Sequence, residues 1–207
     1  MILSKNSHVL FYGDSITDCG RNRDDINSLG GGYAFLIAGR LQSAYPGWNL
    51  KFTNKGIGGN RVFDLEERLE KDVLALKPDV VSIMIGINDT WRRYDSNVVS
   101  RIDEFQASYD RILTRITTEL TSRVILLEPF LLPVPEDRKK WREDLDPRIT
   151  AVRELAWKYK VPYVALDGIF ATAATMAPAD YWLPDGVHPS LAGHGLIASA
   201  WIRAIKN

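Results

Sequence analysis

Ser15, Asp185 and His188 are the residues whose types and spacing best fit a chemical reaction. A serine hydroxyl is a weak nucleophile, and a histidine is suited to take its proton near neutral pH. The histidine then needs an acceptor at its other ring nitrogen. Asp185 lies three residues before His188, where a single turn brings a carboxylate to Nδ1. Taken alone, Ser15 is better explained as the cap of a helix or turn, so the prediction of acyl transfer depends on these partners.

Acyl transfer also needs hydrogen-bond donors that are in place before the tetrahedral oxyanion forms. We expect three such donors: the backbone N–H of Ser15, the backbone N–H of Gly59 and the side-chain amide of Asn88. A glycine at position 59 lets the backbone approach a substrate with no Cβ in the way. The predicted site therefore has a nucleophile, a base, an acid and an oxyanion hole.

The elements that must position these residues follow from the hydrophobic pattern. Short apolar runs predict strands at 8–12, 50–54, 80–85, 124–127 and 163–166. Helical periodicity predicts helices at 33–41, 62–76, 98–120, 148–160 and 190–205, with a short one near 169–176. The charged, proline-containing segment 130–146 is expected to be a solvated loop or helix face. Strands alternating with helices predict an α/β fold with a parallel sheet covered by helices on both faces.

The carboxyl ends of parallel strands lie on one rim of such a sheet, where open α/β folds place their chemistry. Ser15, Gly59 and Asn88 follow the first three predicted strands, and His188 follows the last. We therefore expect all four at the same rim.

Composition narrows the class of protein. The 207 residues suit a single domain, residues 1–207, and 26 basic against 26 acidic residues give no net charge. No basic stripe favours nucleic acid, and no apolar run is long enough for a bilayer. A single cysteine, Cys19, permits no intramolecular disulfide, and the N-terminus lacks the features of a signal peptide. We expect a cytoplasmic protein that binds neither nucleic acid nor membrane.

Other site classes fit less well. The glycine cluster at 55–60 fails as a dinucleotide loop because its third glycine would fall on Arg61. Neither a phosphate-binding P-loop nor a G-x-S-x-G elbow occurs. A metallophosphoesterase remains a distant alternative, because segments 13–14 and 86–89 are similar to metal-binding loops, although three histidines supply few ligands. A binding module that has lost catalysis is a further alternative, disfavoured because all the expected catalytic positions are filled.

Four blocks of the sequence resemble the SGNH (GDSL-type) hydrolase family: Gly13-Asp14-Ser15-Ile16, residues 54–59 (NKGIGG), residues 86–89 (GIND) and residues 185–189 (DGVHP). The first block has isoleucine where the family name implies leucine. Longer matches around these blocks are similar to bacterial carbohydrate acetylesterases of the family, notably intracellular acetylxylan esterases.

The resemblance implies a flavodoxin-like three-layer α/β/α sandwich with a five-stranded parallel sheet. It implies a serine esterase with Ser15, Asp185 and His188 as the triad and Ser15, Gly59 and Asn88 as the oxyanion hole. The implied substrate is an acetylated sugar, with acetylated xylo-oligosaccharides favoured, and no metal or cofactor and a homo-oligomeric assembly are expected. Lysophospholipase or thioesterase activity is the alternative within the family.

Residues near the four blocks are candidates for substrate contact. Trp91, Tyr94 and Trp182 are expected near the rim of the site, where aromatic faces can stack on sugar rings, although packing under loops or at a subunit contact explains them equally well. Asp14 is a further candidate, and we expect its carboxylate to hold the Ser15 loop through a backbone hydrogen bond. The other two histidines, His8 and His194, are expected to be structural.

Overall fold

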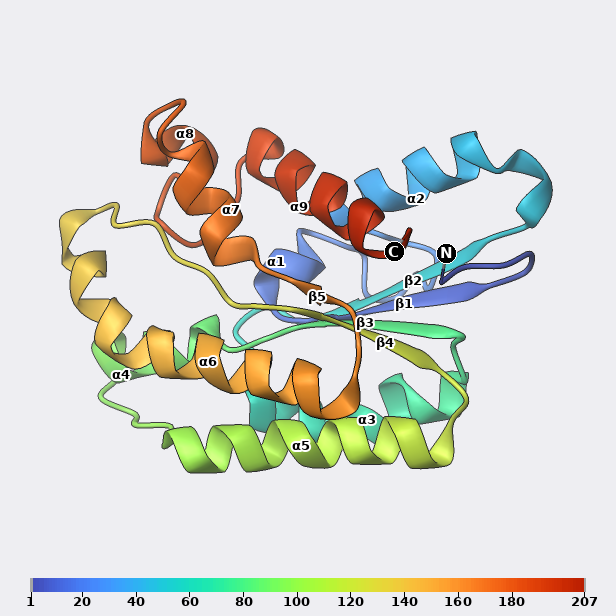
Figure 1. The fold of residues 1–207 in the computed structure, drawn as a ribbon, viewed down its shortest axis with the longest axis horizontal. Helices are drawn as coiled ribbons and strands as arrows, with labels where there is room; N and C mark the ends of the chain where they lie inside the picture. Colours follow the sequence, from blue (N-terminus) through green and yellow to red (C-terminus); the bar gives the residue numbers. More distant parts are fainter. Residues whose placement is uncertain (1, 207) are drawn as a thin grey trace.

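A five-stranded parallel sheet forms the centre of the molecule (Figure 1). The structure is a computed structural model, and it describes residues 2–206. The strands lie in the order β2-β1-β3-β4-β5, and every neighbouring pair is parallel. Their bounds are β1 His8–Gly13, β2 Lys51–Gly56, β3 Val80–Met84, β4 Arg123–Leu127 and β5 Tyr163–Val164. This is the strand order of flavodoxin-like sheets, in which ligands bind where the order reverses, beside β1 and β3.

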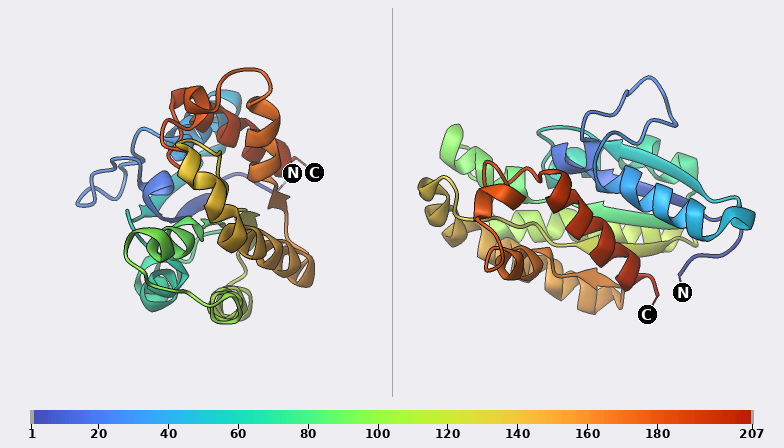
Figure 2. Two further views of the ribbon diagram at one scale, coloured as in Figure 1. Left: turned by 90° about the vertical axis from the view of Figure 1, so that its left-hand side faces the viewer. Right: turned by 90° about the horizontal axis from the view of Figure 1, so that it is seen from above.

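Helices cover both faces of the sheet, which confirms the predicted three-layer sandwich (Figures 1 and 2). One layer contains α2 (Tyr33–Ala44), α7 (Leu166–Ala173) and α9 (Leu191–Ala204). The opposite layer contains α3 (Val62–Asp72), α5 (Ile102–Glu119) and α6 (Arg142–Tyr159). Shorter helices are α1 (Ser15–Asp18), α4 (Ile87–Asp95) and α8 (Ala179–Trp182), with 3₁₀ turns at Pro46–Trp48, Leu74–Leu76 and Glu136–Trp141.

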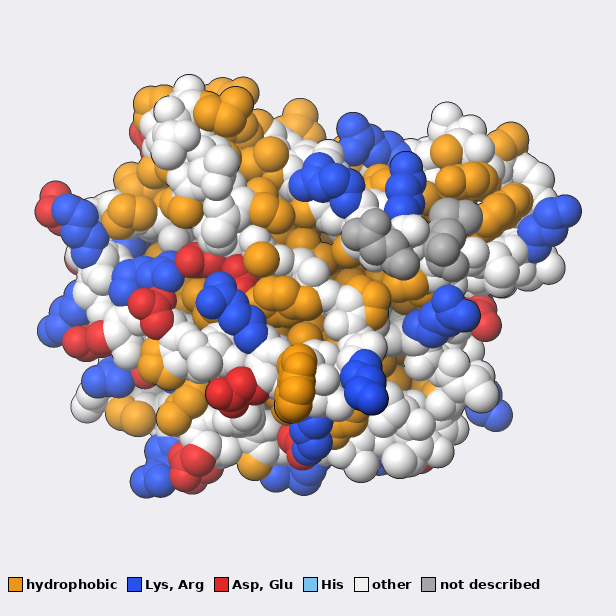
Figure 3. All heavy atoms as spheres, viewed as in Figure 1, with side chains coloured by type: hydrophobic (Ala, Val, Ile, Leu, Met, Phe, Trp, Pro, Cys, Tyr) orange, Lys and Arg blue, Asp and Glu red, His pale blue; other side chains and the backbone are white. Residues whose placement is uncertain are grey.

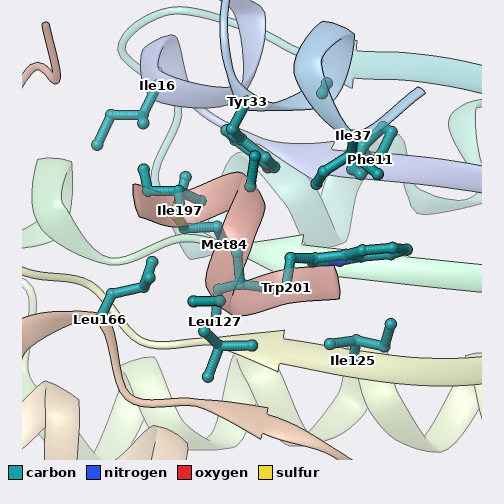
Figure 4. Close-up of a cluster of buried hydrophobic side chains, with 14 of the residues drawn as sticks. Phe11, Ile16, Tyr33, Ile37, Met84, Ile125, Leu127, Leu166, Ile197 and Trp201 are labelled. Atoms are coloured by element: carbon teal, nitrogen blue, oxygen red, sulfur yellow. The ribbon is translucent and has the colours of Figure 1, made fainter. Parts of the chain in front are cut away.

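Each face of the sheet has its own hydrophobic core because side chains alternate along a strand. Figure 4 shows the core under α9, where the fully buried indole of Trp201 lies beside Phe11 and Ile37. The Trp201 Nε1–H donates to Ser82 Oγ at 2.9 Å, so the one polar atom of the indole has a partner in β3. These cores fix the strand ends that carry the polar residues.

The structure differs from the sequence prediction at several elements. Residues 87–95, expected as a loop, form α4, whose buried part is its first turn (Ile87 to Thr90). Its apolar residues Ile87, Trp91 and Tyr94 have helical spacing, a signal that the prediction passed over in this short polar segment. Helix α6 begins at Arg142, not 148, and contains Pro147, whose missing N–H removes one helical bond near the start of the helix. The last predicted strand is shorter than expected, because Leu166 already belongs to α7.

The surface carries both signs of charge side by side. Figure 3 shows Lys and Arg interspersed with Asp and Glu over the face in view, with apolar side chains between them. The most exposed large apolar side chain is Trp157 on α6, at 85% of its full exposure. Within residues 2–206, none of the helices has both the length and the apolar character required to cross a bilayer.

Candidate active site

Ser15 lies at the carboxyl end of β1, as the first residue of α1. The Asp14 side chain caps this short helix, because its Oδ1 accepts the backbone N–H of Ile16 at 3.0 Å. That contact confirms the backbone role expected of Asp14. As the first residue of a helix, Ser15 has a backbone N–H that no carbonyl of the same helix accepts, so this donor is free to bind a substrate.

His188 and Asp185 complete a chain of hydrogen bonds that begins at Ser15. The distance between Ser15 Oγ and His188 Nε2 is 2.9 Å, and that between His188 Nδ1 and Asp185 Oδ2 is 2.7 Å. The carboxylate keeps the ring proton on Nδ1, so that Nε2 presents its lone pair to the serine hydroxyl. The sequence-predicted nucleophile, base and acid thus lie together in the order that proton transfer requires.

A rigid loop holds this Asp–His pair. The second carboxylate oxygen of Asp185 accepts the backbone N–H of His188 at 2.7 Å and of Val187 at 2.9 Å. Gly186 has a φ of +83°, and its carbonyl accepts the Leu132 N–H at 2.9 Å. A Cβ at this glycine would meet the backbone carbonyls of Leu132 and Val134. The loop is therefore fixed both by its own turn and by the chain that follows β4.

Their mutual hydrogen bond shifts the pKa values of both His188 and Asp185. The hydrogen bond to Asp185 is the main cause that raises the pKa of His188 above its ordinary value of 6.5, against the opposing effect of burial. Partial burial raises the pKa of Asp185, but hydrogen bonds from His188 and Val187 outweigh that effect and lower it to about 2. Asp185 is thus ionised at neutral pH, and its negative charge favours a proton on the His188 ring.

The three predicted oxyanion donors face the same cleft as the hydroxyl of Ser15. Ser15, Gly59, Asn88 and His188 line a cleft of about 280 Å³. Gly59 has a φ of +82°, a conformation that glycine adopts without strain. The buried Asn88 side chain donates from Nδ2 to the Asn60 carbonyl at 3.0 Å, which orients the amide and leaves its second hydrogen free.

Three residues of α4, namely Trp91, Arg92 and Asp95, form the remaining wall of the cleft. The Trp91 ring lies 5.7 Å from the His188 ring and 5.1 Å from the Trp141 ring, centre to centre. The Arg138 guanidinium stacks over Trp141, 3.9 Å from its ring centre, and lies 5.1 Å from the ring centre of Trp91. The Trp91 indole beside His188 is thus packed against Trp141 and Arg138 on its other side.

The other residues predicted at the rim lie away from the cleft wall. Asp14 is buried below Ser15, with 1% of its surface exposed. Tyr94 stacks on Trp141, and its hydroxyl lies 3.0 Å from two acceptors, the Lys140 carbonyl oxygen and Glu143 Oε1. Trp182 packs edge-to-face against Tyr181 and is not part of the wall.

The two remaining histidines have structural contacts, as expected. His194 Nδ1 accepts the Tyr33 N–H at 3.1 Å, and its Nε2 lies 3.4 Å from Cys19 Sγ. Burial lowers the pKa of His194 to about 4, so it stays neutral. His8 Nε2 lies 2.9 Å from Thr53 Oγ1.

Asp95, Arg138 and Trp141 were not predicted near the site. Asp95 is the last residue of α4, and Arg138 and Trp141 lie in the proline-containing segment after β4, so no sequence motif links them to Ser15. Across residues 2–206, no group of three or more His, Cys, Asp or Glu side chains is arranged to hold a metal ion. The arrangement is instead suited to nucleophilic attack on an ester, with proton transfer through His188 and donors around the carbonyl oxygen.

Comparison with known proteins gives consistent results. The model of the GDSL-like Lipase/Acylhydrolase family matches residues 11–196. An acetylxylan esterase of Geobacillus stearothermophilus is 40% identical over 99% of this chain and 96% of its own length. The structure of a mutant acetyl xylan esterase from the same organism superposes with a TM-score of 0.92 at 37% identity, covering 99% of this chain and 97% of its own. A GDSL-like lipase from Parabacteroides merdae, described as putative, superposes with a TM-score of 0.95 at 35% identity and the same coverage.

Proposed function

The chain belongs to the GDSL-like lipase/acylhydrolase family and is a carboxylic ester hydrolase, and we propose that it removes acetyl groups from acetylated xylo-oligosaccharides. The observation that carries the mechanism is the continuous contact from Ser15 Oγ through the His188 ring to the Asp185 carboxylate. The acetylxylan esterase that is 40% identical along almost the whole chain supports the substrate class.

In the first half-reaction, Ser15 Oγ attacks the acetyl carbonyl carbon while His188 Nε2 takes the hydroxyl proton. Negative charge then develops on the carbonyl oxygen, and it is stabilised by the N–H groups of Ser15 and Gly59 and by the Asn88 amide. His188 next gives its proton to the sugar oxygen as the bond between that oxygen and the carbonyl carbon breaks. The sugar leaves as an alcohol, and the acetyl group remains on Ser15.

In the second half-reaction, water replaces the sugar. His188 takes a proton from the water as the oxygen attacks the acetyl carbonyl, and the same three donors hold the second oxyanion. Collapse of this intermediate returns the proton to Ser15 Oγ and releases acetate. Asp185 stays ionised throughout, because its low pKa keeps the proton on the imidazole.

Acetate release tests this proposal directly. The enzyme is given acetylated xylo-oligosaccharides and, separately, a long-chain p-nitrophenyl ester, with the wild type and Ser15→Ala side by side. We expect acetate from the sugar, slow turnover of the long-chain ester, and loss of both in the variant. A preference for the long-chain ester would move the substrate to lipids or thioesters, and activity in Ser15→Ala would contradict the mechanism. Hydrolysis of a phosphate ester that is lost on chelation would favour a metal-dependent phosphoesterase instead.

We also propose that residues 1–207 act as one domain in a cytoplasmic homo-oligomer. Exposed large apolar side chains, Trp157 at 85%, Met176 at 78% and Leu191 at 74%, support self-association. The free thiol of Cys19 suits a reducing compartment. Light scattering on the purified protein tests the oligomeric state, and a monomeric mass would contradict the proposal. Fractionation of the source cells tests the cytoplasmic location.

A further inference from the structure

A second hollow adjoins the catalytic cleft on the side of the oxyanion hole. It has a volume of about 420 Å³, and Gly59 and Arg92 line both cavities. A Cβ built on Gly59 would lie 3.9 Å from an outer nitrogen of the Arg92 guanidinium, so this side chain stands where the two cavities meet. With the cleft of about 280 Å³, the pair reaches the size of pockets that hold drug-sized ligands. An acetyl group alone fills only a small part of this space.

Arg92 is held firmly in that position. Its guanidinium donates to Asp95 Oδ2, and Asp95 Oδ1 in turn accepts the Ser96 hydroxyl at 2.6 Å. The Arg92 carbonyl accepts the backbone N–H of Ser96 at 3.2 Å and of Val98 at 2.9 Å, which folds the chain back at the end of α4. Both the backbone and the side chain of Arg92 are therefore preorganised, and a guanidinium held by one carboxylate keeps further N–H donors for a ligand.

The lining of the second hollow is polar and its charges balance. Arg61 and Arg92 are its basic groups, and each pairs with a carboxylate: Asp64 lies in the same lining, and Asp95 lies in the adjoining cleft. The Asn60 amide contributes a further polar group, and the Asn60 carbonyl holds Asn88 of the oxyanion hole. Hydrogen-bonding groups without excess charge suit a neutral ligand with many hydroxyls better than an anion or a lipid chain.

The reaction determines how a sugar chain can lie across the two cavities. The ester oxygen must come within hydrogen-bond reach of His188 Nε2, so the sugar that carries the acetyl group occupies the cleft beside Trp91. The next sugar of the chain can then pass Arg92 and enter the second hollow. Resting on the proposed function, we propose that this hollow, lined by Arg61 and Arg92, is a subsite for a neutral, unacetylated sugar adjacent to the one that is deacetylated.

The test compares acetylated xylose with acetylated xylobiose, each carrying one acetyl group. For the wild type we expect kcat/KM to rise at least about tenfold from the single sugar to the pair, mainly through a lower KM, as charge-assisted hydrogen bonds to hydroxyls allow. Arg92→Ala and Arg61→Ala should each reduce this ratio towards one, and Arg92→Lys should restore part of it. Arg101→Ala, an exposed arginine at the start of α5, serves as control and should keep the ratio.

Several results would overturn the assignment. Equal kcat/KM for the two substrates in the wild type, or an unchanged ratio in both arginine variants, would show that the hollow binds no sugar. A higher kcat/KM when the second sugar carries a carboxylate would show that the hollow binds an anion and not a neutral sugar. If neither sugar is hydrolysed while p-nitrophenyl acetate is turned over by the wild type and not by Ser15→Ala, the proposed substrate fails together with this subsite, but the esterase chemistry stands.

Discussion

Replacing Asp185 with asparagine isolates the contribution of one carboxylate to catalysis. Asparagine keeps an oxygen for the backbone N–H groups of Val187 and His188, so the loop should retain its shape. It removes the negative charge beside Nδ1, and its amide group can donate to that nitrogen. The imidazole would then carry its proton on Nε2, where it cannot accept the proton of Ser15.

The expected decrease of kcat in Asp185→Asn has two parts. An ion pair with charges about 4 Å apart is worth about 1 kcal/mol in water and about 4 kcal/mol near a protein surface. The Asp185 and His188 side chains are 40% and 44% exposed, so their interaction lies between these limits, and its loss slows the reaction by about 5-fold to 1,000-fold. The unfavourable tautomer adds to this, which gives a decrease in kcat of about 10³–10⁴-fold.

The assay is the pH profile of kcat/KM with p-nitrophenyl acetate, with circular dichroism as the control for folding. The wild type needs neutral His188, so its activity should fall as the pH drops through the raised pKa of that histidine, above 6.5. In Asp185→Asn the cause of the raised pKa is gone, and the midpoint should move to lower pH. A folded variant that keeps more than about a tenth of the wild-type kcat would refute this reasoning.

Three further changes test separate parts of the site. Asn88→Ala should lower kcat by about 10²–10³-fold with a small change in KM, because the amide acts on the oxyanion, and a pure KM effect would contradict its role. Gly186→Ala should lower the melting temperature by about 4–8 °C, because a Cβ at positive φ meets two carbonyls, and an unchanged value would show that the loop can move aside. Burial raises the pKa of Asp14 to about 7, so folding favours its protonated form and the wild type should lose stability between pH 3.8 and about 7. In Asp14→Asn the melting temperature should depend less on pH across that range than in the wild type. The same pH dependence in both proteins would contradict the prediction.

The sequence predicted most of the framework because buried strands and amphipathic helices leave clear patterns. Val80 to Met84 is buried on both faces and apolar apart from Ser82, and α5 and α3 repeat apolar residues at helical spacing. The positions of Ser15 and Asn88 at one rim follow from parallel topology. His188 comes only after α7 and α8, so topology alone does not place it there. Helix α4 was missed although Ile87, Trp91 and Tyr94 have helical spacing, because the segment is short and its other residues are polar.

The surroundings of the triad were predicted less well, for a physical reason. Trp91 lies on the cleft wall, but Tyr94, three residues later in the same helix, turns towards Trp141 and leaves the cleft. Which side of a polar helix faces a site depends on what packs behind it, and here that is the Arg138–Trp141 segment. Such contacts between distant loops have no local sequence signal.

Capture of the acyl-enzyme tests the central claim most directly. The wild type is mixed with p-nitrophenyl acetate, quenched in acid during turnover, digested and analysed by mass spectrometry, with Ser15→Ala treated in parallel. The mechanism predicts one added acetyl group on the peptide that contains Ser15, absent from the variant, which should also lack turnover. An acetyl group on another residue, or full turnover by Ser15→Ala, would contradict the assignment of Ser15 as nucleophile.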